Sequence, residues 1–281
     1  MQVKHVKFEK GSVFDLLGFL FKELKNEKGI PLENDATRDI SFYFMQFLDD
    51  QTKGFLRKVC KLLRVKCVIE IEKWGFWEGI ELCLYAARHG FLFLLQWARE
   101  NGYRWNDYIC SEAAKGGYLD ILKWVRKQKP PCPWDKFTCA QAAKGGHLNV
   151  LQWLREQDPP CPWDVWTCAK AARGGYLNVL QWAHENGCPW NEQTCTWAAE
   201  RGHLDVLQWL RKQNPPCPWD EWTCTGAAEG GHLNILKWVR ENNCPWDGWT
   251  CEEAAKRGHR DVLRYAIENK CSGYEKYIQY I

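Results

Sequence analysis

Cysteine and tryptophan are the residues whose number and spacing could serve a chemical site in this 281-residue chain, which holds 15 and 18 of them. The tripeptide Cys-Pro-Trp occurs five times, and a second cysteine follows seven residues after each of its cysteines, as in Cys132 and Cys139. Two thiolates held close together can bind a metal ion, and two adjacent pairs could supply the four ligands of a zinc site. A redox-responsive role is the related alternative for the same thiols.

The spacing favours packing over chemistry for these cysteines. Six residues between two cysteines is not a usual zinc-knuckle spacing. The imidazole nearest to the pair, His147, is replaced by Tyr118, Tyr176 and Phe91 at the corresponding places of other copies, and a ligand position would not accept phenylalanine. We therefore expect thiols that pack as small hydrophobic groups, with no cofactor and no metal. A cysteine-based metal-binding or redox-responsive protein remains the alternative function.

The tryptophans fall into three series that recur with the cysteines. They are Trp105, Trp134, Trp163, Trp190, Trp219 and Trp246 in a turn; Trp97, Trp124, Trp153, Trp182, Trp209 and Trp238 in a later apolar segment; and Trp166, Trp222 and Trp249 just before the second cysteine. Aromatic residues at fixed repeat positions usually stack in a core, so we predict core positions for all three series. A base-stacking platform for single-stranded nucleic acid is the alternative, but it lacks a matching basic groove.

These series belong to an internal repeat. The Cys-Pro-Trp tripeptides begin at Cys132, Cys161, Cys188, Cys217 and Cys244, which gives steps of 29, 27, 29 and 27 residues. The series of second cysteines continues toward the N-terminus with Cys110 and Cys83. Seven copies of the repeat therefore lie between about Trp77 and Cys271. A fixed period of this length is the signature of a stacked repeat architecture.

Each copy predicts two helices that must position these residues. Asp135 is a suitable N-cap for the first helix, because its carboxylate can accept hydrogen bonds from the free amides of the first turn. Cys139, Ala142 and Ala143 follow at helical spacing and form a small-residue stripe. The pair Gly145-Gly146 ends this helix, and a more apolar helix begins at His147. Such a hairpin cannot bury its apolar face alone, so the copies must stack.

At these residues the chain resembles the ankyrin repeat. The segment from Ala142 to Leu151 is similar to the family's A-A-x-x-G-H-L-x-V-V core, and similar segments begin at Ala171, Ala198, Ala227 and Ala254. Where ankyrin helices open with T-P-L-H, this chain has Cys139 in place of the buried leucine, and the usual period of about 33 is shortened. The missing residues correspond to the projecting β-hairpin. Short repeats rich in tryptophan and cysteine look like those of ankyrin-type proteins in large DNA viruses and protists.

The resemblance implies an all-α solenoid of helical hairpins that lacks the long β-hairpin fingers. We predict an N-terminal helical cap at residues 1–73, seven ankyrin-like repeats at residues 74–271 and a C-terminal tail at residues 272–281. The net charge of +3 argues against a strongly basic nucleic-acid binder or a polybasic membrane-surface protein. No stretch is long and apolar enough for a membrane span. We expect a location in the cytoplasm, or the host cytoplasm if the source is a virus, with the nucleus as the alternative.

The binding face is predicted from the positions whose residues differ between copies. A residue that all copies share is already explained by its role in the fold. Such positions lie two and five residues after the helix cysteine, on the first helix, which in the ankyrin resemblance lines the concave face. The predicted partner-binding residues are Tyr85, Glu112, Lys115, Gln141, Lys144, Lys170, Arg173, Trp197, Glu200, Glu229 and Glu253. A solvated face with drifting charges is the alternative.

Charge along this face changes sign. The later of the two positions is basic from Arg88 to Arg173 and acidic at Glu200 and Glu229. This predicts a surface divided into a basic and an acidic half, which would suit a partner of opposite polarity. Trp197 lies near the change of sign and is the predicted anchor, since aromatic contacts often dominate binding energy.

No catalytic constellation occurs outside the repeated scaffold. The Gly-Gly pairs lie between helices and lack the Lys-Ser/Thr of a phosphate-binding loop. We therefore predict a monomeric, non-catalytic scaffold that binds another protein, with no nucleic acid and no membrane as partner. An adaptor that recruits substrates to a ubiquitin ligase is a subtype by analogy with other ankyrin proteins, although no clear F-box-like segment is present.

Overall fold

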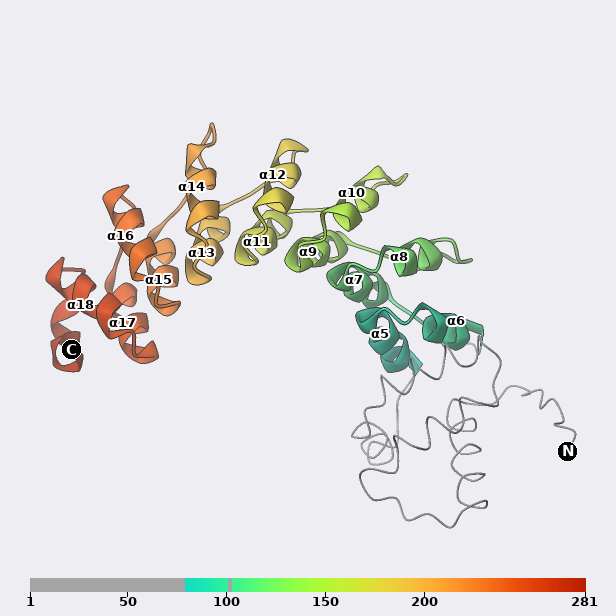
Figure 1. Ribbon diagram of the computed structural model, residues 1–281, viewed down its shortest axis with the longest axis horizontal. Coiled ribbons are helices and arrows are strands. Elements are labelled where there is room, and N and C mark those ends of the chain that lie inside the picture. Colours follow the sequence, from blue (N-terminus) through green and yellow to red (C-terminus); the bar gives the residue numbers. More distant parts are fainter. Residues whose placement is uncertain (1–78, 101–102) are drawn as a thin grey trace, which may run out of the picture. The chain divides into compact units, whose positions relative to one another are not determined.

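The structure, a computed structural model, describes residues 79–100 and 103–281 (Figure 1). The predicted cap at residues 1–73 lies outside the described residues. The chain divides into two compact units, of which the first is Met1–Ala86 with Phe91–Arg104 and the second is Ala87–Gly90 with Trp105–Ile281. Each unit is described by itself below.

The described part of the first unit contains most of α5 (Gly79–His89) and α6 (Leu92–Glu100). Cys83, Ala86, Leu95 and Ala98 are fully or almost fully buried. The predicted site residue Tyr85 lies in this unit, with its ring stacked on Phe91 at 6.4 Å between centroids. The small residues Cys83 and Ala86 of α5 are therefore packed in the core, as are the corresponding cysteines and alanines of the later repeats.

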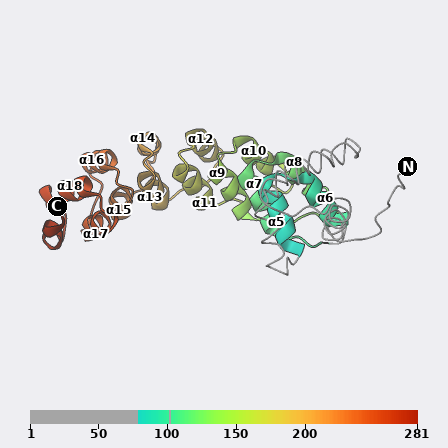
Figure 2. The same cartoon turned by 60° about the horizontal axis from the view of Figure 1, so that its bottom comes forward.

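The second unit is a series of helical hairpins. Its helices are α7 (Asp107–Gly116), α8 (Leu119–Arg126), α9 (Lys136–Gly145), α10 (Leu148–Glu156), α11 (Val165–Arg173), α12 (Leu177–Glu185), α13 (Glu192–Glu200), α14 (Leu204–Lys212), α15 (Glu221–Glu229), α16 (Leu233–Glu241), α17 (Gly248–Arg257) and α18 (Arg260–Glu268). The odd-numbered helices form one row and the even-numbered helices a second row, in both views (Figures 1 and 2). We call these rows the inner and the outer row. The prediction of an all-helical hairpin solenoid is confirmed, and the described residues contain no strand.

Four inner helices begin at the aspartate cap that the sequence predicts, and α9 also ends at the predicted glycine pair. The carboxylate of Asp135 accepts a hydrogen bond of 3.0 Å from the backbone N–H of Phe137. Asp164, Asp220 and Asp247 cap their helices in the same way. Gly146 terminates α9 with φ 76° and its N–H bonds to the carbonyls of Ala142 and Ala143. The outer helix starts at Leu148 instead of His147, which takes the position just before it.

Neighbouring repeats are joined by a histidine ring that packs against a glycine of the preceding repeat. The ring of His147 reaches back to the end of α7, where Nε2 lies 3.0 Å from the carbonyl oxygen of Lys115. A Cβ at Gly117 would lie 2.6 Å from His147 Nδ1, so only glycine admits the ring there. His203 and His259 make the same contact with the carbonyls of Arg173 and Glu229. The Gly-His pattern therefore fixes the spacing between repeats as well as the end of a helix.

The core lies between the two rows. Cys139, Ala142 and Ala143 of α9 are fully buried, as are Val150 and Leu151 of α10. Small side chains on the inner row allow close helix packing, while the larger apolar residues of the outer row fill the space between hairpins. No helix in the described residues is long and apolar enough to cross a membrane.

The last described segment is a 3-10 helix, η1 (Tyr274–Tyr280). The hydroxyl of Tyr277 donates a hydrogen bond of 3.4 Å to a carboxylate oxygen of Glu252 on α17. The boundaries at residues 73 and 271 stay predictions.

Candidate functional site

The cysteines form contacts between consecutive repeats. Cys139 Sγ donates to the carbonyl oxygen of Cys161 at 3.7 Å, and Cys161 Sγ donates to the carbonyl oxygen of Asp135 at 3.3 Å. In the preceding repeat, Cys110 Sγ donates to the carbonyl oxygen of Cys132, and Cys132 Sγ donates to the carbonyl oxygen of Asn106. The five helix cysteines from Cys110 to Cys224 thus each bond to the backbone of the next turn cysteine, and the sequence spacing did not reveal this partner.

These thiols are poorly suited to nucleophilic or metal chemistry. All 13 described cysteines are free and buried. A hydrogen bond with the Cys110 thiol, together with burial, raises the pKa of Cys132 far above its ordinary value. The pKa of Cys161 is raised in the same way by Cys139 and by burial. Because the thiolate is the reactive and metal-binding form, the arrangement favours packing. The described residues contain no group of three or more side chains that could hold a metal ion.

The turn tryptophans pair with tryptophans of the outer row. Trp134 lies edge-on to Trp153, with 6.1 Å between ring centroids. Arg126 of the preceding repeat lies 3.9 Å from the Trp134 centroid and donates a hydrogen bond of 2.6 Å to the carbonyl oxygen of Cys132. Arg155 and its counterparts repeat both contacts. The described rings of these two series pack against one another but are half-buried, so the prediction of core positions holds only in part. The arginine two residues after Trp124, Trp153, Trp209 and Trp238 is the signal that sequence reasoning missed.

The third tryptophan series contradicts the prediction of core positions. Trp166, Trp222 and Trp249 are exposed, because they occupy the first turn of the inner helices while the following threonine points into the core. Tyr108 and Phe137 take the same place in α7 and α9, and the exposed fraction of the five side chains ranges from 37% to 62%. In α13 this place is Gln193, but Trp197 lies one turn later and its ring is 5.2 Å from that of Trp166. We call Tyr108, Phe137, Trp166, Trp197, Trp222 and Trp249 the aromatic stripe.

The predicted binding positions share a helix face with this stripe. Trp166, Lys170 and Arg173 follow one another at steps of four and three residues, which places them on one side of α11. The same steps relate Phe137, Gln141 and Lys144 on α9. The variable residues and the exposed aromatics therefore belong to one surface of the inner row.

Cations gather around Trp197. Lys170 Nζ lies 5.1 Å and Arg173 Cζ 5.0 Å from the Trp197 ring centroid. Burial, followed by the charges of Lys144, Arg173 and Lys115, lowers the pKa of Lys170. The positive charges of Lys144, Arg173 and Lys115 thus disfavour the charged form of Lys170. We call Lys115, Lys144, Lys170 and Arg173 the basic cluster.

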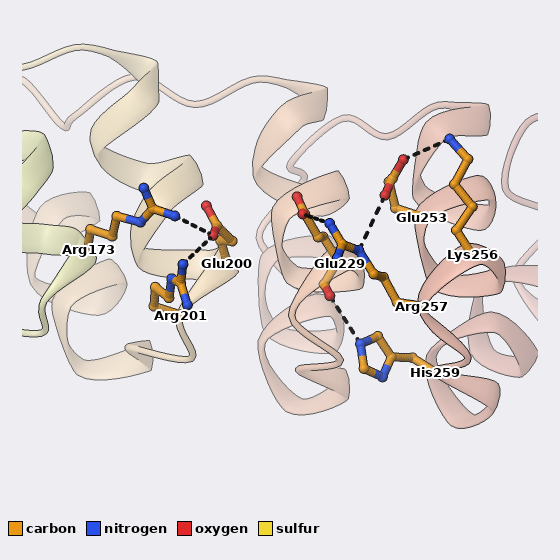
Figure 3. Close-up of polar contacts among 8 residues, drawn as sticks. All are labelled: Arg173, Glu200, Arg201, Glu229, Glu253, Lys256, Arg257 and His259. Carbon is orange, nitrogen blue, oxygen red and sulfur yellow. Dashed lines mark hydrogen bonds and ion pairs between the residues drawn. The ribbon is translucent and has the colours of Figure 1, made fainter. Parts of the chain in front are cut away.

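The predicted acidic residues Glu200 and Glu229 each form an ion pair with an arginine. Glu200 accepts contacts of 2.9 Å from Arg173 and 3.2 Å from Arg201, and Glu229 pairs with Arg257 (Figure 3). The first of these ion pairs crosses the expected boundary between the halves. The predicted basic and acidic halves are therefore not separate, because Arg173 of the first pairs with Glu200 of the second, and Glu229 is matched by Arg257, which sequence reasoning did not consider.

The other predicted site residues are tied into local contacts. Glu112 pairs with Arg88 at 2.9 Å, and its side chain is only 15% exposed. Glu253 pairs with Lys256 at 3.1 Å, as Figure 3 also shows. Gln141 is half-buried, and its Oε1 is buried without a hydrogen-bond partner in the described residues. The open charges of the predicted face thus belong to the basic cluster.

Two comparisons with known proteins gave a match. Residues 168–211, which run from α11 to α14, match a protein-family model described as ankyrin repeats in many copies. The chain is also similar to the crystal structure of the human ASB11 ankyrin repeat domain over 58% of this chain and 84% of that chain, at 12% identity and a TM-score of 0.41. A search of curated proteins gave no match.

Ankyrin repeats generally mediate protein–protein interaction and are typically non-catalytic scaffolds. The predicted resemblance to ankyrin repeats is confirmed for residues 168–211. The partner and the face that binds it are matters of proposal.

Proposed function

We propose that the chain is a non-catalytic scaffold that binds another protein through the inner row of its second unit. The observation that carries the proposal is the aromatic stripe, which places Trp166, Trp222 and Trp249 in solvent although such rings are usually buried. Exposed apolar patches of this kind mark interaction surfaces in soluble proteins. The basic cluster lies on the same surface and supplies polar contacts beside the rings.

The cysteine-based alternative has less support. The described thiols are buried, and the raised pKa values of Cys132 and Cys161 disfavour their thiolates. We keep the cytoplasm as the expected location and a monomer as the expected state.

A capture experiment tests this function. The chain is immobilised and incubated with lysate of the cells that produce it, and the bound proteins are quantified by mass spectrometry. The inner-row variant Lys144→Glu is compared with Lys123→Glu, which changes the same charge on an exposed residue of the outer row. We expect Lys144→Glu to lose a specific protein that Lys123→Glu retains. Equal capture by both variants would refute the inner row as the binding face.

A further inference from the structure

The aromatic stripe is continuous with the basic cluster over the first part of the second unit. Tyr108, Phe137 and Trp166 each stand at the start of an inner helix, and Lys115, Lys144 and Arg173 stand seven residues later on the same helices. A side chain from a partner that contacts a stripe residue is therefore one to two helical turns from a cation.

The cations of the cluster are largely available to a partner. Lys115 and Lys144 are exposed, and neither they nor Lys170 form an ion pair within the described part of the chain. Glu200 pairs with Arg173 and is the one carboxylate that an ion pair joins to the cluster among the described residues. Four positive charges and one negative charge give this surface a local excess of three positive charges.

A bound carboxylate would relieve the repulsion within the cluster. The charges of Lys144, Arg173 and Lys115 act on Lys170, which also loses solvent beside Trp197. An anion placed among these groups is attracted by each of them, and the partly desolvated site strengthens the attraction relative to open water.

We propose that the partner presents an extended acidic segment to this surface, with carboxylates opposite the basic cluster and apolar side chains on Phe137, Trp166 and Trp197. The inference rests on the proposed function and names the chemistry of the partner. Packed helices lie about 10 Å apart, and a chain in the extended polyproline II conformation advances about 3.1 Å per residue with three residues per turn. One repeat therefore spans about one turn of the segment, so an apolar side chain can meet the stripe at every third position with two carboxylates between.

The same surface is less suited to single-stranded nucleic acid. Base stacking requires cations along the whole path of the backbone. The stripe continues at Trp222 and Trp249, but there it is accompanied by Glu221, Glu252 and Glu253. Lys256 is occupied by ion pairs of 2.6 Å with Glu252 and 3.1 Å with Glu253. The cations thus serve only part of the stripe, which favours a short acidic segment of a protein.

A peptide series tests the inference with the full chain. The probe is a fluorescein-labelled peptide of about twelve residues built from Glu-Glu-Leu triplets, matching the three-residue step. Peptides of the same length built from Gln-Gln-Leu and Lys-Lys-Leu, and a single-stranded oligouridine, are the comparators. Binding is followed by fluorescence anisotropy at low and at high salt.

Matched variants locate the binding. The inner variant carries Lys115→Gln, Lys144→Gln and Lys170→Gln, and the control carries Lys123→Gln, Lys127→Gln and Lys212→Gln on the outer row. We expect the inner variant to bind the acidic peptide about tenfold more weakly, since each exposed charge pair contributes modestly, and the control to bind as the unaltered chain does. Thermal unfolding of both variants shows whether they fold. If the inner variant does not fold, the single change Lys144→Gln should still weaken binding about twofold.

Four results would overturn the proposal. These are no binding of the acidic peptide, equal losses in the two variants, equally tight binding of the Lys-Lys-Leu peptide, and tighter binding of oligouridine than of the acidic peptide. The capture experiment separates this failure from failure of the proposed function. A protein lost from Lys144→Glu but not bound through acidic residues would leave the scaffold function intact and refute only the acidic segment.

Discussion

The tryptophans of the second unit occupy two contrasting environments. In the turns, Trp134 lies edge-on to Trp153, and Arg126 covers it while bonding to a backbone carbonyl. On the inner row, Trp222 and Trp249 stack on each other at 6.3 Å but remain exposed. The turn tryptophans contact side chains from two repeats, whereas the inner-row tryptophans face solvent on one side.

This difference shows that position within the repeat decides what a tryptophan does. A turn ring is enclosed by an outer helix and by the preceding arginine, so it contributes buried area and fixes the spacing of hairpins. A ring in the first turn of an inner helix faces away from the core, because the next residue, such as Thr167 after Trp166, takes the buried position. The first environment stabilises the fold, and the second is available for binding.

The largest effect is expected where turn and outer-row tryptophans pack together. Trp153→Ala, which removes the outer-row partner of Trp134, should lower the free energy of unfolding by about 2 to 3 kcal/mol, somewhat less than for a fully buried tryptophan because the ring is half-buried. Phe137→Ala is the matched change on the stripe and should alter stability by no more than about 0.5 kcal/mol. Urea unfolding of the two variants measures both values. Equal destabilisation would erase the contrast between the two environments.

The inner row should tolerate change only where a side chain points away from its neighbours. A Cβ at Gly226 would lie 2.8 Å from the backbone oxygen of Thr196, so α13 and α15 would have to separate. We expect Gly226→Ala to destabilise the chain by about 2 kcal/mol despite the higher helix propensity of alanine. Gln141→Ala, at the same position of α9, should have a much smaller effect in the same denaturation assay. A neutral Gly226→Ala would show that the close approach of the helices is not required.

The cysteines, like the turn tryptophans, are expected to stabilise the fold. Cys168 is fully buried beside Cys188, so Cys168→Ala should leave a small void and cost about 1 to 2 kcal/mol of stability. A chelator should leave the melting curve of the unaltered chain unchanged. Stoichiometric zinc in the purified protein, with unfolding on its removal, would instead support a metal-binding role.

The smallest effect concerns the one turn among α8 to α16 where histidine replaces arginine. His184 stacks on Trp190 at 3.6 Å, and burial lowers its pKa. A lowered histidine pKa favours the neutral form in the folded state, so stability is complete above about pH 6.5 and falls as the pH drops through that value. His184→Arg should add about 0.5 kcal/mol through the cation–π contact and reduce this pH dependence. Thermal unfolding between neutral and mildly acidic pH checks both points, and an unchanged pH profile would exclude His184 as its source.

Much of the fold could be predicted from the sequence because its signals are local. Asp135 and Gly146 each act within a few residues, so the N-cap and the end of α9 follow from short-range rules. The repeat then extends that prediction to every copy. The stacking of the copies follows from the apolar face that each hairpin leaves uncovered.

The site was less predictable because it depends on contacts between repeats. The ion pair of Arg173 with Glu200 joins residues 27 positions apart, and the sequence does not indicate that these two side chains meet. Exposure of Trp166 depends on its place beside the N-cap, whereas repetition alone suggested a core residue. Cys139 and Cys161 likewise meet only after the repeats have stacked.

The most direct test of the division between structural and binding tryptophans compares Trp197→Ala with Trp182→Ala. Thermal unfolding and capture of the partner from native lysate are measured for both variants. We expect Trp197→Ala to lose about 2 kcal/mol of binding with little change in the unfolding midpoint, and Trp182→Ala, whose ring lies 6.0 Å from Trp163, to lower that midpoint clearly. If Trp197→Ala unfolds as readily as Trp182→Ala, Trp197 is a core residue and the inner row is not the binding face.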